Sequence, residues 1–254
     1  MAVSIDNVYQ KVLAITNKEQ RGYITPQEFN LFADQAQMEI FEQYFYDINQ
    51  FRRISGNDHA YANILSNLED KISIFKRHDV QIQHLQQSNG YITINRDNID
   101  DIYRIGLVKY KYKHDHEALP AVEAKMEDMT GNHEKSPLTY SSTISTNPPI
   151  YFKLNNQILG DRIIRVKPPV DVGNGGKIWL NYIKTPSKPN WGYVVVNNKP
   201  LYNANSSQDF ELHLSEESEL VYKILTLFGI NLQKPDLAQA AAQMEVSKIQ
   251  QEKS

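Results

Sequence analysis

The chain of 254 residues contains no cysteine, which excludes disulfide bonds, thiol catalysis and zinc sites built on thiolates. It also lacks a strong charge of either sign: the net charge of -3 gives no global attraction to DNA or to membranes. No apolar run approaches the length needed to cross a bilayer, and the N-terminus lacks the pattern of a signal peptide. We therefore expect a soluble protein made in a cytoplasm, with one large or two modest domains.

The stretch from Thr25 to Phe51 has the clearest helical pattern. Thr25 is a good N-cap, Pro26 suits the first helical position, and Glu28 completes a capping box. The helix carries a first apolar row at helical spacing: Phe29, Phe32, Ala33, Ala36, Ile40, Tyr44 and Ile48. A second apolar row follows Leu31, Met38, Phe41 and Phe45.

Two apolar rows are more than one small core needs, so this helix is predicted to bury surface against two neighbours. We expect the first row to pack against residues 5–15 and 220–228 of the same chain. We expect the second row to contact another subunit, through Met38, Phe41 and Phe45.

Helical spacing also predicts helices over residues 4–20 and from residue 58 to about 75. Near the C-terminus, Ser215 is a predicted N-cap and Gly229 a predicted C-cap, and Leu220 to Phe228 form an apolar face. Pro235 opens a last, mostly polar helix with a thin apolar stripe that includes Leu237, Met244 and Ile249. This helix buries too little to be stable in isolation, so it is either frayed or held by a partner.

The middle of the chain has the short apolar runs and turn residues of a β-rich region. Strands are predicted at 91–94, 102–113, 151–154, 162–166 and 177–183, with one more at 192–196. The sequence therefore predicts an α+β fold in three parts: helices in 1–88, an inserted barrel or sandwich in 89–210, and helices in 211–254. The last part completes the helical bundle and ends in the extended C-terminal helix.

Lys109, Lys111 and Lys113 alternate with tyrosines along the clearest strand. They form a candidate DNA-facing row, because lysines on one strand face can neutralise phosphates. The alternative is that lysines protect an exposed sheet edge from pairing with other strands.

Few other residues form a pattern that indicates chemistry. His114 and His116 lack a third ligand at a suitable spacing, and Asp97, Asp100 and Asp101 share a turn rather than a defined cleft. The glycines of residues 173–176 are placed as in a hairpin turn and do not match a phosphate loop. We expect no enzyme, no cofactor and no metal. A nucleic-acid-binding module and, more weakly, a tail-associated hydrolase are the alternative functions.

Three segments, taken in order, resemble a family of virion structural proteins from crAss-like phages and related marine tailed phages. They are QRGYITPQEFNLFADQAQMEIFEQYF, GGKIWLNYIKTPSKPNWGY and DFELHLSEESELVYKILTLFGI, the last followed by a tail rich in Ala and Gln. The resemblance covers nearly the whole chain, and its most specific parts are residues 20–46 and 176–193.

This resemblance implies a head-to-tail connector, also called an adaptor or ring protein, of the virion, assembled in the host cytoplasm. Such proteins form a ring, typically of about twelve copies, that binds the portal and other tail or ring proteins around the channel for packaged DNA. The C-terminal segment of such proteins often contacts the portal. Leu237, Met244 and Ile249 are therefore the candidate portal-docking residues.

Overall fold

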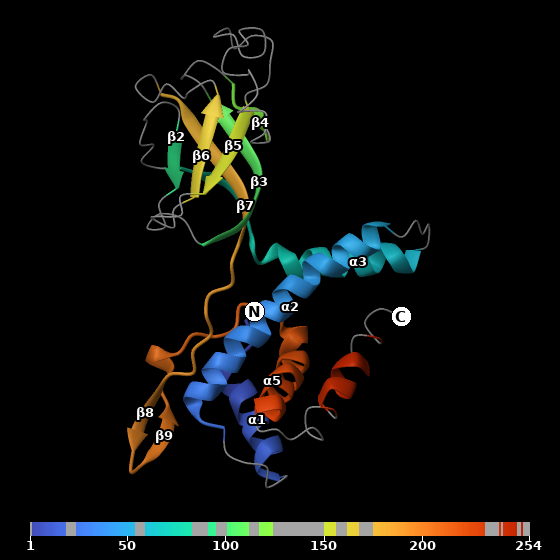
Figure 1. The fold of residues 1–254 in the computed structure, drawn as a ribbon, viewed down its shortest axis with the longest axis vertical. Coiled ribbons are helices and arrows are strands. Elements are labelled where there is room, and N and C mark those ends of the chain that lie inside the picture. The colour runs from blue at the N-terminus through green and yellow to red at the C-terminus, as the bar shows by residue number, and fades with distance from the viewer. Residues whose placement is uncertain are drawn as a thin grey trace. The chain divides into compact units, whose positions relative to one another are not determined.

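The computed structural model describes residues 2–18, 24–53, 59–82, 91–94, 101–111, 117–123, 150–155, 162–167, 175–231, 239, 241–247 and 250. The chain forms two compact units, shown in Figure 1. Unit 1 combines Met1–Ile74 with Pro186–Ser254, and unit 2 is the intervening Phe75–Thr185. The divisions therefore lie at residues 75 and 186, whereas the sequence predicts them after residues 88 and 210.

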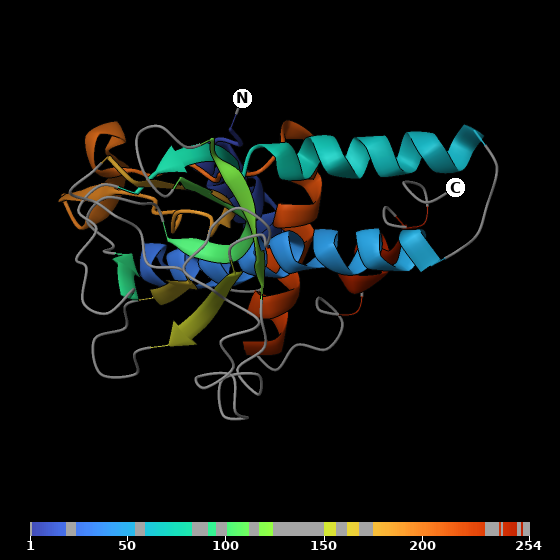
Figure 2. The same cartoon turned by 90° about the horizontal axis from the view of Figure 1, so that it is seen from above.

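Unit 1 is mainly helical. Its elements are α1 (Ile5–Lys18), α2 (Pro26–Arg53), α3 (His59–Ser73), β8 (Tyr193–Val196), β9 (Lys199–Tyr202), η3 (Ala204–Ser206), η4 (Leu214–Glu216) and α5 (Glu217–Asn231). Helices α2 and α3 run side by side, and α5 crosses α2 (Figure 2). The core of the unit buries Phe29, Ala33, Ala36, Ile40 and Tyr44, which confirms that most of the first row of α2 packs within the chain. The other two residues of the row, Phe32 and Ile48, are half-buried.

The capping box at the start of α2 is present. The hydroxyl oxygen of Thr25 accepts a hydrogen bond from the Glu28 backbone amide at 3.3 Å. The Glu28 carboxylate in turn accepts from the Thr25 amide at 3.0 Å and from its hydroxyl at 2.7 Å. These hydrogen bonds from Thr25, the hydroxyl first, lower the pKa of Glu28 because they favour the charged carboxylate. The prediction from sequence spacing is confirmed here.

Both predicted ends of α5 are wrong. Ser215 lies inside the 3-10 turn η4, whose N-cap is His213, and the α-helix itself begins at Glu217. Gly229 lies within α5, which continues to Asn231. The prediction of the buried face is confirmed, since Leu220, Ile224 and Phe228 are all buried.

Unit 2 contains a seven-stranded sheet in the order β1-β7-β3-β4-β5-β6-β2. Its strands are β1 (Lys76–Gln81), β2 (Tyr91–Ile94), β3 (Ile102–Lys111), β4 (Leu119–Glu123), β5 (Ile150–Asn155), β6 (Arg162–Lys167) and β7 (Lys177–Lys184). Among the described strand pairs, only β4–β5 is parallel. Because β1 and β2 are edge strands, the described strands do not close into a barrel.

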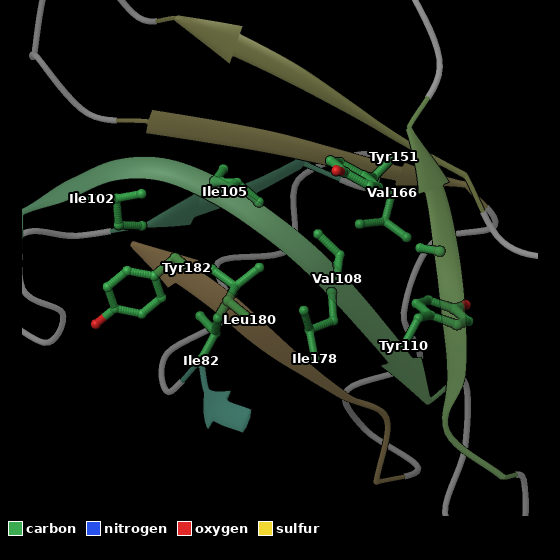
Figure 3. Packing of buried hydrophobic residues seen from close by; sticks show 11 residues of the cluster. Ile82, Ile102, Ile105, Val108, Tyr110, Tyr151, Val166, Ile178, Leu180 and Tyr182 are labelled. Atoms are coloured by element: carbon green, nitrogen blue, oxygen red, sulfur yellow. The ribbon is translucent and has the colours of Figure 1, made fainter. Parts of the chain in front are cut away.

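The core of unit 2 lies between different parts of this one sheet. Figure 3 shows Tyr151 of β5 and Val166 of β6 facing the apolar side chains of β3 and β7, among them Val108 and Leu180. The fold is thus α+β, as predicted, because helices and a mostly antiparallel sheet occur in the same chain.

Candidate functional site

A polar row on α2 holds the chain segment that returns from unit 2. The side-chain amide of Asn30 accepts a hydrogen bond from the Trp191 backbone amide at 2.7 Å and donates to the Trp191 carbonyl at 3.3 Å. Further along the helix, the buried Gln37 donates to the Ser187 carbonyl at 2.8 Å and accepts from the Glu211 amide at 3.0 Å. Asn30 and Gln37 lie seven residues apart, so both fall on one face of the helix.

Trp191 is almost fully buried and anchors the hairpin formed by β8 and β9. Its indole N–H donates to the Asp6 carboxylate at 2.9 Å. The centre of its ring lies 4.2 Å from the centre of the Tyr9 ring and 5.8 Å from the ring centres of Tyr193 and Tyr202. Tyr193 begins β8 and Tyr202 ends β9, so the root of this hairpin is fixed to α1 by contacts between aromatic rings.

The next residue, Gly192, is required by close packing. A Cβ atom added there would lie 2.7 Å from the Ser206 carbonyl oxygen, which is closer than real Cβ contacts. The Gly192 amide donates to the Ser207 hydroxyl at 3.0 Å, and its carbonyl accepts from the Asn203 amide at 2.8 Å. The hairpin therefore starts from a rigid base.

The hairpin itself projects from unit 1 (Figure 1). Its turn residues Asn197 and Asn198 have φ angles of 49° and 59°, as a type I′ turn requires. The cross-strand pairs Val194–Leu201 and Val196–Lys199 share one side of the ribbon, because they are two residues apart along each strand. We call these four residues the hairpin face. Val194, Val196 and Leu201 are 51%, 46% and 54% exposed.

A cavity of about 460 Å³ lies elsewhere in unit 1, bordered by the C-terminal half of α2, by α3 and by the start of the η4–α5 segment. We call it the α2–α3 cavity. It is partly open to solvent, and more of its lining is apolar than polar. The apolar lining consists of Ile40, Tyr44, Phe51, Ile64 and Leu68.

The charged lining of the α2–α3 cavity is mostly acidic. It comprises Asp47, Asp70, Glu216 and Glu219 against the single base Lys71, with His213 also present. Glu216 is fully buried, and its carboxylate lies 2.6 Å from the Lys71 ammonium. Lys71 also lies 5.8 Å from the centre of the Tyr44 ring, a cation–π contact.

The predicted subunit-contact residues of α2 are in different environments. Phe41 is fully buried within unit 1, and its ring packs edge to face on Phe45 with 5.0 Å between centres. Met38 and Phe45 are half-buried. Phe41 therefore belongs to the core of a single chain, and the predicted contact with another subunit stays a prediction for Met38 and Phe45.

The C-terminal docking residues are described only in part. Residues 241–247 are helical, Ala241 is buried, and Glu245 forms an ion pair with Lys223 of α5 at 2.5 Å. Met244 is 54% exposed, and Val246 is 53% exposed. Leu237 and Ile249 lie outside the described residues. Their predicted role, like that of Met244, stays a prediction.

Two residues of the lysine row, Lys109 and Lys111, lie on the internal strand β3. Because β3 lies between β7 and β4, the alternative that lysines protect a sheet edge is wrong for Lys109 and Lys111. Lys109 and Lys111 flank the buried Tyr110 and are half-exposed on the opposite face. Lys109 pairs with Asp79 at 2.6 Å, and Lys111 lies opposite the exposed Lys177 of β7. Lys113 lies outside the described residues.

Most of the candidate residues for hydrolysis or metal binding lie outside the described residues. His114, His116, Asp97 and Asp100 lie outside the described ranges, and Asp101 accepts a backbone hydrogen bond from Thr185 at 2.7 Å. Among the residues that the structure places, no group of three or more potential ligands could hold a metal ion.

The hairpin face and the α2–α3 cavity are not recognised from the sequence. The short apolar run of β8 predicts a strand, but such a run does not indicate whether other parts of the chain cover it. The cavity combines residues from positions 40–71 and 213–219, which no local pattern connects. Within the described ranges, no helix has both the length and the apolar character needed to cross a membrane. Comparisons with protein-family models and with curated proteins found no match for this chain.

Proposed function

We propose that this chain is a structural protein of a tailed-phage virion, a ring-forming head-to-tail connector. In this role about twelve copies surround the DNA channel and join the portal to the tail. Unit 1 supplies a helical bundle from both ends of the chain, and unit 2 is the inserted β-rich domain, whose core lies between different parts of one sheet. The protein works by binding its neighbours and needs neither catalysis nor a cofactor. The resemblance of the three segments named above supports this proposal.

The observation that carries the proposal is the hairpin face. It presents Val194, Val196 and Leu201 to solvent on a hairpin whose root is fixed by Trp191. Contiguous exposed apolar side chains are characteristic of protein interaction sites, because their burial against a partner is favourable. A rigid base lowers the entropy cost of association. A ring offers each copy such a partner in its neighbour.

A second surface suits the portal. Met244 and Val246 are both more than half exposed on a helical segment that Lys223 and Glu245 tie to α5. A helix that presents apolar side chains to solvent can lie in a groove of a partner protein. We assign this segment to portal docking.

Native mass spectrometry and negative-stain microscopy of the full chain, with and without the portal protein of the same virion, test the proposal. We expect a cyclic oligomer, at least in the presence of the portal. A chain that stays monomeric with the portal present contradicts the proposal.

The docking surface has its own variant and control. Met244→Asp with Val246→Asp should weaken portal binding at least tenfold while the chain stays folded, because both side chains are exposed. Gln243→Asp is the matched control, since Gln243 is exposed on the same segment but polar. If the two variants bind the portal equally well, this segment is not part of the portal contact.

A second candidate function is binding of nucleic acid by the outer face of β3 and β7. Lys111 and Lys177 lie directly opposite each other, an arrangement that is unfavourable unless an anion lies over it. Half-exposed Trp179 is on the same side of β7 as Lys177, and aromatic rings can stack on bases.

Double-stranded DNA binding at several salt concentrations tests this candidate. Lys111→Ala with Lys177→Ala should lower the affinity and reduce the salt slope by about two, one for each phosphate that is no longer neutralised. Lys188→Ala is the control, because this lysine is highly exposed in unit 1. No binding at low salt eliminates the candidate.

A further inference from the structure

We propose that the hairpin face of one copy docks into the α2–α3 cavity of the neighbouring copy. This inference rests on the proposed ring and identifies the contact that closes it. The occupant of the cavity is thus a second copy of this chain.

The hairpin face has an apolar part and a basic part. Val194, Val196 and Leu201 form the apolar part, and Lys199 is adjacent to the turn. Lys199 is also the only charged residue of residues 193–202, so the hairpin carries a single positive charge at its tip. The opposite side of the ribbon is occupied near the root by Tyr193 and Tyr202, whose rings contact that of Trp191.

The α2–α3 cavity has the complementary character. Ile40, Phe51, Ile64 and Leu68 offer an apolar lining to the valines and to Leu201. Asp70, a carboxylate of the lining, offers an opposite charge to an incoming ammonium group. Asp70 is exposed, so it can meet Lys199 without rearrangement of the core. The volume of about 460 Å³ falls in the range of sites that enclose a bound group.

The hairpin and the cavity of one chain lie too far apart to meet. The hairpin is held near Asn30, whereas the cavity borders α2 from Ile40 to Phe51. At the rise of an α-helix, these positions are about 15 to 30 Å apart along α2. Figure 1 shows the hairpin directed away from the C-terminal end of α2. A projection and a cavity at separate places on one chain give a head-to-tail contact, which produces a closed ring when the rotation between copies closes.

The absence of cysteine makes cross-linking a clean test. Val196→Cys is placed in one preparation and Asn67→Cys, an exposed lining residue of the cavity, in another of different mass. The two are mixed under mild oxidation, and heterodisulfides are counted by mass spectrometry. Each partner has a control one residue away: Val195→Cys lies on the other side of the hairpin, and Ser66→Cys is exposed on α3 outside the cavity lining. We expect the Val196–Asn67 pair to react at least tenfold more than either control pair.

The outcomes separate this inference from the proposed function. A cyclic oligomer with equal reaction of all pairs overturns the hairpin contact and leaves the connector proposal standing. A chain that forms no oligomer, even with the portal, overturns both. A selective heterodisulfide within a cyclic oligomer supports both.

Charge reversal provides a second readout that does not depend on cysteine. Lys199→Glu should weaken self-association at least tenfold, because a carboxylate then meets the acidic cavity. Adding Asp70→Lys to the same chain should restore association, since the pair is then reversed. If Lys199→Glu assembles as the wild type does, or if Asp70→Lys gives no rescue, the proposed pairing is wrong.

Discussion

Asn30 on α2 and Trp191 on the returning segment are joined by two hydrogen bonds across 161 positions of sequence. The Trp191 amide donates to the Asn30 side chain at 2.7 Å, and the side-chain amide of Asn30 donates back to the Trp191 carbonyl at 3.3 Å. One side chain thus satisfies both backbone groups of a buried residue. This contact fixes the segment from which the hairpin projects.

Asn30→Ala should lower the free energy of unfolding of unit 1 by about 1–3 kcal/mol, because it leaves partly buried backbone groups unpaired. Asn30→Asp should also be destabilising, since it keeps the acceptor for the Trp191 amide but turns a carboxylate oxygen toward the Trp191 carbonyl and the Asn190 side-chain oxygen. Urea unfolding followed by tryptophan fluorescence measures both. Equal stability of Asn30→Ala and wild type would show that water replaces the contact.

Gln37→Leu should be destabilising in the same way, by about 2–4 kcal/mol, because the Ser187 carbonyl and the Glu211 amide lose their partner inside the protein. The leucine is similar in size, so the loss reflects hydrogen bonding rather than a cavity. Gln35→Leu is the control: Gln35 is exposed on the same helix and should change stability by less than about 0.5 kcal/mol. Thermal unfolding of the two variants side by side distinguishes them.

Phe41→Asp should unfold unit 1 or leave it marginally stable, since it places a charge where the side chain has no exposure. Met38→Asp should leave the fold intact, because Met38 is half-buried. Circular dichroism reports the folding of each variant, and native mass spectrometry reports its oligomeric state. A folded Phe41→Asp monomer that fails to assemble would instead place Phe41 between subunits.

The capping box predicts that the stability of the folded protein depends on pH. The hydrogen bonds from Thr25 lower the pKa of Glu28 below its ordinary value of 4.5. A carboxylate with a lowered pKa in the folded state contributes stability above its unfolded pKa, and this contribution is lost as the pH falls through the folded pKa. Thermal melts should therefore show that wild type loses more stability than Glu28→Gln when the pH falls from about 5 to about 3.

The same box can be removed from its other side. Thr25→Ala should cost about 0.5–2 kcal/mol at neutral pH, as for other N-cap residues. Its cost should shrink in acid, where Glu28 is protonated. Thermal melts of both variants at the two pH values give the comparison, and a cost of Thr25→Ala that does not change with pH would contradict a role for the Glu28 charge.

Local sequence signals determined the helices and most of the strands. The rows of α2, its capping box and the buried face of α5 follow from spacing that the chain sets over one or two turns. Strands β2, β3, β5, β6, β7 and β8 likewise follow from short apolar runs. The strands that the sequence does not predict have weak local patterns: β1 reads KRHDVQ, and β4 and β9 contain Pro120 and Pro200.

Only the tertiary structure decided which surfaces are covered. Phe41 and Phe45 belong to the same apolar row, yet one is buried and the other half-exposed, because the neighbours of α2 come from distant parts of the chain. The buried Lys71–Glu216 pair joins residues 145 positions apart, and the polar row of Asn30 and Gln37 acquires its role only when residues 187–211 return to α2. The spacing of apolar residues along a helix or strand indicates which of its sides is apolar. Which apolar side is left for a partner depends on long-range packing, which no local pattern contains.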